Sequence, residues 1–199
     1  MAETEQLLVP RKEYLIAGIQ VGTTHRTRDM EDFVYKVNPT GLAILNIHRI
    51  DTRLKLAGAL LAKYEPQDIL VVSRRENGWK AVKQFAKATG VRIYTDRYPA
   101  GVLTNPGLET FTEPRIVMIT DPWPDKNAVH DAITAGIPII ALCDSNNDMR
   151  NVDLLVPCNN KGAKSLGLIY WILANQYLHE RGLLPKKKEL EIPVKDFQE

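Results

Sequence analysis

Three polar loops in the sequence follow apolar runs and combine positive charge with amide side chains. Residues 158–162 (Cys-Asn-Asn-Lys-Gly) close the last apolar run and open the longest expected helix. A helix N-terminus offers free N–H groups and the positive end of the helix dipole, so this loop favours an anion. The other two loops are residues 74–78, ahead of another helix, and residues 96–106. Basic, amide-rich loops without a nucleophile suit binding of a phosphate backbone better than bond cleavage.

A catalytic interpretation would depend on three other residues. Asp121 and Asp144 follow apolar runs and are the best carboxylate pair for a metal ion or for acid–base chemistry, with His25 as a general base. However, each aspartate precedes a loop or helix start, where it can satisfy backbone N–H groups. We favour that structural role. His25 lies in a basic run, residues 23–28, where contact with a phosphate needs no catalytic partner.

Motifs that bind nucleotides or activate a nucleophile are absent from the sequence. It contains no G-x-G-x-x-G, no G-x-x-x-x-G-K-[ST] and no G-x-S-x-G. Cys143 and Cys158 have neither C-x-x-C spacing nor a histidine at zinc-ligand spacing, so we expect reduced core residues. We therefore predict no metal, no cofactor and no small-molecule substrate.

The composition is that of a globular protein. The 199 residues are 44% hydrophobic and 25% charged, and this length favours one domain. No apolar run reaches ~18 residues and residues 1–11 show no signal-peptide pattern, so we expect a cytoplasmic protein without a membrane partner.

Charge is distributed unevenly along the chain, although the net charge is only +2. Residues 74–97 hold seven basic and two acidic side chains, and residues 161–188 hold six and one. Residues 98–131 hold two basic and five acidic side chains, and residues 189–199 hold one and four. This pattern is typical of a molecule that binds a polyanion on one side. Solvated helix faces would give the same pattern, so charge alone does not decide.

Short apolar runs alternate with helical patterns along most of the chain. Continuous apolar runs predict strands that are covered on both faces, and strand–helix alternation predicts a doubly wound parallel sheet of the α/β class. The expected strands are residues 42–47, 69–73, 91–95, 115–120, 137–143 and 154–158. The expected helices are residues 51–66, with Asp51 as the cap, and residues 77–90, 125–136 and 160–182.

Aromatic residues divide into two groups. Trp79, Phe85 and Trp171 lie on apolar helical stripes and are expected in the core. Tyr98 and Trp123 lie in loops, where each could stack on a base or anchor its loop on the core. Residues 96–113 are rich in proline and glycine and predict a long surface loop.

Five segments strongly resemble one protein family. They are residues 17–23 (AGIQVGT), 103–106 (LTNP), 120–122 (TDP), 137–144 (IPIIALCD) and 153–162 (DLLVPCNNKG). The family is the second protein of the small ribosomal subunit in its archaeal form, which is related to the eukaryotic laminin-receptor-precursor protein. The resemblance covers residues 12–184 in order and spacing. Gln20 stands where the family often has histidine, and Trp123-Pro124 replaces a more usual charged pair.

The resemblance implies a single flavodoxin-like α/β domain without enzymatic activity. It also implies binding to small-subunit ribosomal RNA, contact with neighbouring small-subunit proteins, and a role in translation and subunit assembly in the cytoplasm. We divide the chain into an N-terminal tail (residues 1–13), the domain (14–184) and a charged C-terminal tail (185–199). We expect the acidic end, residues 189–199, to be disordered in the free protein.

The predicted RNA-binding residues share a basic or hydrogen-bonding side chain in one of the polar loops. They are His25, Arg26, Thr27, Arg28, Arg74, Arg75, Arg97, Thr104, Asn105, Asn159, Asn160, Lys161 and Lys164. Two alternatives remain open at this point. One is a sugar-phosphate or nucleotide enzyme that uses Asp121, Asp144 and His25, because fold does not fix function. The other is a protein-interaction module that uses residues 98–131 and the C-terminal tail.

Overall fold

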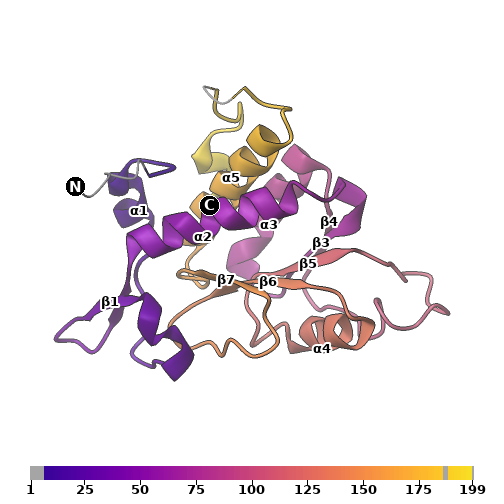
Figure 1. Ribbon diagram of the computed structural model, residues 1–199, viewed down its shortest axis with the longest axis horizontal. Helices are drawn as coiled ribbons and strands as arrows, with labels where there is room; N and C mark the ends of the chain where they lie inside the picture. Colours follow the sequence, from indigo (N-terminus) through magenta and orange to yellow (C-terminus); the bar gives the residue numbers. More distant parts are fainter. Residues whose placement is uncertain (1–6, 186–187, 199) are drawn as a thin grey trace.

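The computed structural model describes residues 7–185 and 188–198 (Figure 1). Its centre is a five-stranded parallel sheet in the order β4-β3-β5-β6-β7. Every residue of β3, β5, β6 and β7 is buried, as expected for continuous apolar runs covered on both faces. The predicted doubly wound α/β fold is confirmed. The strands are β3 (Ile69–Ser73), β4 (Arg92–Thr95), β5 (Ile116–Ile119), β6 (Ile139–Cys143) and β7 (Leu154–Pro157).

Helices cover both faces of this sheet (Figure 1). α2 (Ile47–Leu61), α3 (Glu76–Thr89) and α5 (Ala163–Glu180) pack together on one face, and α4 (Lys126–Ala135) lies on the other. Gly90 and Gly136 end α3 and α4 with φ of 79° and 68°, a left-handed conformation that favours glycine. Both helix ends were predicted from these glycines.

All five strands run parallel, so the loops that follow them lie at one edge of the sheet, and the strand order marks a point along that edge. β3 leads through α3 outward to β4, and β5 leads through α4 in the opposite direction to β6. The order therefore reverses between β3 and β5. In open α/β sheets, ligands bind at such a point, beyond the carboxyl ends of the strands.

The N-terminal region differs from the prediction in two ways. Residues 42–47 were expected to form a strand of the main sheet. Instead β2 (Ala43–Leu45) pairs antiparallel with β1 (Val34–Val37) in a separate two-stranded sheet. α2 begins earlier than predicted, at Ile47, because the Asn46 side chain accepts the His48 N–H at 3.0 Å and caps the helix.

Asp51 is therefore not a helix cap. It lies inside α2, where its carboxylate accepts the Tyr14 hydroxyl at 2.6 Å and the Leu8 N–H at 2.8 Å. Tyr14 belongs to α1 (Arg11–Ala17), so the predicted boundary between residues 13 and 14 falls inside a helix. Asp51 ties this N-terminal segment to the domain.

The C-terminal segment, residues 188–198, packs on the domain, which corrects the expected disorder of residues 189–198; residue 199 lies outside the described residues. It contains a short helix, α6 (Val194–Phe197), whose Phe197 is only 1% exposed. The Trp171 indole N–H donates to the Ile192 carbonyl at 3.0 Å, and the Leu190 N–H donates to Asn175 Oδ1 at 2.7 Å. The expectation of disorder rested on the charge of this segment. The apolar residues between the charged ones nevertheless provide its contact area with the domain.

The sequence analysis did not predict the 3-10 helix that residues 28–33 (Arg28–Phe33) form before β1.

In the described part of the chain, no helix has the length and apolar character needed to cross a membrane.

Candidate nucleic-acid interface

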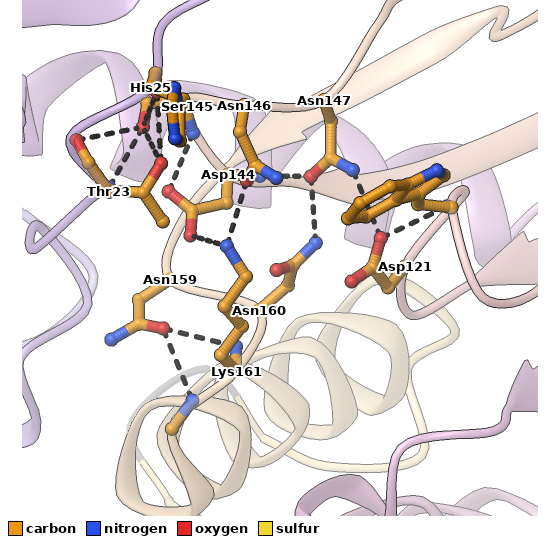
Figure 2. A network of polar contacts seen from close by, with 12 residues as sticks. Thr23, His25, Asp121, Asp144, Ser145, Asn146, Asn147, Asn159, Asn160 and Lys161 are labelled. Atoms are coloured by element: carbon orange, nitrogen blue, oxygen red, sulfur yellow. Dashed lines mark hydrogen bonds and ion pairs between the residues drawn. The ribbon is translucent and has the colours of Figure 1, made fainter.

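The loops after β5, β6 and β7 meet in a network of polar contacts at the carboxyl edge of the sheet (Figure 2). Asp121, in the loop that follows β5, is only 1% exposed. Its Oδ2 accepts Arg75 Nε at 2.6 Å, and its Oδ1 accepts Asn147 Nδ2 at 3.0 Å and the Trp123 N–H at 3.1 Å. Both carboxylate oxygens are thus occupied, and the guanidinium neutralises the charge.

Asp144, after β6, has the same arrangement with a different cation. Its Oδ2 accepts Lys161 Nζ at 2.9 Å and its Oδ1 accepts the Ser145 N–H at 2.6 Å. Lys161 Nζ also donates to Asn146 Oδ1 at 2.8 Å. The buried carboxylates that could have repelled a polyanion are therefore both paired inside the protein.

Two buried asparagines join these pairs. Asn147 Oδ1 accepts the Asp144 N–H at 2.7 Å and Asn160 Nδ2 at 3.0 Å. Asn160 also donates to the Leu142 carbonyl at 2.9 Å, and its side chain has no solvent exposure. Asn160 was predicted to contact RNA. We correct that assignment, because in this conformation its amide cross-links two loops below the surface.

The first loop, residues 23–28, is held against the same edge. The Thr23 N–H donates to Ser145 Oγ at 2.9 Å, and Thr27 Oγ1 donates to the Asn147 carbonyl at 2.7 Å. Gly22 permits this approach, since a Cβ there would lie 2.9 Å from Ser145 Oγ. The fold thereby brings a basic run from the N-terminus beside loops more than 100 residues away.

This geometry does not assemble the catalytic set of the alternative interpretation. His25 enters the network through its backbone carbonyl, which accepts Thr23 Oγ1 and Ser145 Oγ at 2.9 and 3.0 Å, while the residue as a whole is exposed. Asp121 and Asp144 are engaged as described above. Among the described residues, no group of three or more His, Cys, Asp or Glu side chains is placed to hold a metal ion.

A small cavity of about 230 Å³ marks the point where the strand order reverses. It is lined by Arg74, Arg97, Tyr98, Pro124, Asp125 and Asn127. Asp125 is 2% exposed, and one of its carboxyl oxygens accepts the Arg74 N–H at 3.0 Å. Burial raises the pKa of Asp125 to about 7. The cavity is below the roughly 300–1,000 Å³ of typical small-molecule pockets.

The predicted contact residues divide by exposure. Eight are exposed: His25, Arg26, Arg28, Arg74, Arg97, Thr104, Asn105 and Lys164. Four are partly buried and make internal contacts: Thr27, Arg75, Asn159 and Lys161. Asn159 Oδ1, for example, accepts the N–H groups of Lys161 and Gly162 at 3.1 and 3.2 Å ahead of α5.

Thr104 and Asn105 lie apart from the network, in the long loop of residues 96–113. That loop is anchored by Asp131 of α4, whose Oδ2 accepts the Tyr98 hydroxyl at 3.1 Å and the Gly101 N–H at 2.7 Å. Burial and the nearby carboxylate raise the pKa of Tyr98. Of the two alternatives for this aromatic residue, the loop anchor is therefore observed.

The other aromatic residues follow the prediction in part. Phe85 and Trp171 are buried, whereas Trp79 is half-buried and donates its indole N–H to the Ser73 carbonyl at 3.2 Å. Trp123 is 73% exposed.

Sequence reasoning missed Ser145 and Asn147, although the polar run 144–148 after an apolar strand was a signal for a loop with side-chain hydrogen bonds.

Comparison with known proteins identifies the family. The family model described as ribosomal protein S2 matches residues 107–179. A relative from Nanoarchaeum equitans, named small ribosomal subunit protein uS2, is 50% identical over 191 residues, which cover 96% of this chain and 95% of the relative. This chain belongs to the uS2 family of small ribosomal subunit proteins. A relative of the same name from Thermoplasma acidophilum is 41% identical, and the match covers 98% of this chain and 98% of the relative. A third, from Staphylothermus marinus, is 46% identical, and the match covers 97% of this chain and 88% of the relative.

Membership in the uS2 family confirms the resemblance found in the sequence. The family is a structural, non-enzymatic component of the small ribosomal subunit, so the protein is not an enzyme. It is a structural constituent of the ribosome and serves translation. The buried and paired state of Asp121 and Asp144 is consistent with this role.

Proposed function

We propose that the protein binds small-subunit ribosomal RNA through the carboxyl edge of its sheet, contacts neighbouring ribosomal proteins, and supports subunit assembly in the cytoplasm. One observation carries the RNA proposal. Exposed cations from three separate loops surround an edge at which two buried carboxylates, Asp121 and Asp144, are paired internally with Arg75 and Lys161.

The exposed cations come from distant parts of the chain. Arg26 and Arg28 belong to the first loop, which Thr23 and Thr27 hold against the loop after β6. Arg74 follows β3, and Arg97 follows β4 and lines the same cavity. Such contacts position a protein on a phosphate backbone and read little base sequence. Recognition of RNA would then come from its shape and its 2′-hydroxyl groups.

Arg75 and Lys161 have a smaller role in this proposal than the sequence suggested. Their side chains are 28% and 34% exposed and each holds a buried carboxylate. A phosphate would have to compete with that carboxylate for the cation. We therefore propose that the main phosphate contacts are Arg26, Arg28, Arg74 and Arg97, with Lys164 on the first turn of α5.

The salt dependence of binding to in vitro transcribed small-subunit rRNA tests this function. If about five phosphates are neutralised, log K falls with log salt at a slope of about −3.5 to −4.5. The double variant Arg74→Ala/Arg97→Ala reduces the slope by about 1.5. The matched control is Lys63→Ala/Arg92→Ala, which removes two exposed cations at the opposite ends of the strands, beside the start of β7 and at the start of β4. Salt-independent binding, or an equal loss in the control, would reject the proposal.

Contact with neighbouring proteins is supported by a second surface. Leu15 of α1 and Tyr35 of β1 line one groove and are 50% and 69% exposed. Exposed large apolar side chains that lie together mark a protein-interaction surface. We propose that another small-subunit protein covers it.

A further inference from the structure

An open groove of about 390 Å³ lies between the loop after β5 and the loop after β6. Pro122, Val129 and the Trp123 indole supply its apolar surface, and Lys126 and Arg150 supply its positive charge. Asn146, Asn147 and Asp148 also line it. The buried network described above does not use the indole of Trp123, which is 73% exposed.

The main chain that carries this indole is restrained on both sides. Trp123 stands between Pro122 and Pro124, and each proline ring restricts the main chain. The Trp123 N–H donates to Asp121 Oδ1, and that carboxylate is held by Arg75 and Asn147. The loop is thus anchored on its buried side, while the indole remains exposed to solvent. An exposed indole on an anchored main chain is suited to contact with a partner, because the main chain loses little conformational entropy on binding.

The chemistry of the groove favours a nucleobase as the occupant. A base has two flat apolar faces, polar edges and a phosphate at its sugar. The indole offers a face on which the base can stack. The amide of Asn146 and the carboxylate of Asp148 can form hydrogen bonds with the polar edges of the base, and Lys126 is an exposed cation that can contact the phosphate. The Arg150–Asp148 ion pair, at 3.0 Å, joins side chains that are 85% and 50% exposed, so it holds Arg150 only weakly.

We propose that this groove binds one unstacked base of the ribosomal RNA, with Trp123 stacked on the face of the base and Lys126 and Arg150 beside its phosphate. The inference rests on the proposed binding of small-subunit RNA, and it adds a contact that reads an exposed base rather than the phosphate backbone. A single-stranded nucleotide in a loop or bulge would meet this requirement, whereas a base inside a continuous helix would not.

The test compares Trp123→Ala with Trp123→Phe in binding to in vitro transcribed small-subunit rRNA. Loss of one base–aromatic stack lowers affinity by a factor of about 5 to 150. Trp123→Phe keeps an aromatic face and most of the affinity. Trp123→Ala removes no charge, so its salt slope matches the wild type, whereas Lys126→Ala lowers the slope by about 0.7. Tyr35→Ala is the matched control, because Tyr35 is a comparably exposed aromatic residue on β1, away from this edge.

Fluorescence provides a second, direct measurement. Trp171 is buried and Trp79 is half-buried, so Trp123 is the indole most accessible to acrylamide. Saturating RNA should protect this indole, and Trp123→Phe should remove the protected signal.

The possible outcomes separate the inference from the proposed function. Tight, salt-dependent RNA binding with unchanged affinity in Trp123→Ala and an unprotected indole would overturn the inference and leave the RNA-binding function intact. Absence of RNA binding by the wild type at low salt would reject the function itself. Protection of Trp123 only after another ribosomal protein is added would also overturn the inference, in favour of a protein contact.

Discussion

Replacing Arg75 with alanine tests whether the internal ion pair at the sheet edge stabilises the domain. Arg75 holds Asp121, whose side chain is 1% exposed, through Nε at 2.6 Å and a second guanidinium nitrogen at 2.5 Å. Removing one partner of a fully buried pair costs about 3–5 kcal/mol. The Arg75 side chain is 28% exposed and Asp121 keeps two other donors, so we expect a smaller loss of about 2 kcal/mol.

Urea unfolding of Arg75→Ala, Arg74→Ala and the double variant Arg75→Ala/Asp121→Asn measures this loss. Arg74→Ala is the control, because it removes an exposed neighbouring cation while its backbone N–H still donates to Asp125. For a domain of this size, 2 kcal/mol corresponds to a fall in Tm of about 4–8 °C. The double variant should recover part of the loss, since no unpaired buried charge remains. If Arg75→Ala and Arg74→Ala differ by less than about 0.5 kcal/mol, the ion pair does not have the stabilising role assigned to it.

Three further predictions concern other parts of the molecule. Burial raises the pKa of Asp125 to about 7, so between about pH 4 and 7 the folded protein holds a proton that the unfolded chain has released. The free energy of unfolding therefore falls as pH rises through this window, by up to about 1.4 kcal/mol per pH unit, and urea titrations of Asp125→Asn should lack this dependence. Tyr14→Phe leaves one bond to buried Asp51 unmade and should cost about 1–3 kcal/mol in urea unfolding; a neutral result would contradict the anchoring role. Gly167→Ala would place a Cβ 2.8 Å from the Phe197 carbonyl oxygen, so α6 should detach and trypsin should cleave after Lys195 faster than in the wild type. Unchanged protection would show that α6 does not depend on this contact.

Much of the fold could be predicted because its signals are local. The buried run at residues 69–73 was assigned with its observed bounds, and Gly90 and Gly136 marked the ends of two helices. The start of α2 was misplaced because Asn46 and Asp51 are both residues that cap helices. Only the surroundings of Asp51, a tyrosine hydroxyl and a distant backbone N–H, show that it has another role.

The candidate site was predictable in its location but not in the role of each residue. Parallel strands end at one edge, so polar loops after apolar runs had to meet there. Which cations lack an internal partner could not be read from the chain. Arg75 pairs with a carboxylate 46 residues away, and Lys161 pairs with one 17 residues away. The burial of Asn160 could not be predicted for the same reason, because its neighbours are set by packing.

The order of apolar runs, helix ends and polar loops is determined by the amino-acid sequence alone, since each arises from conformational preferences over a few residues. The tertiary structure decided which charges are neutralised, which aromatic ring is exposed, and that residues 188–198 pack on the domain. These properties depend on distance and burial between residues far apart in the chain. Electrostatic and hydrophobic free energies follow that spatial arrangement, whatever the spacing along the sequence.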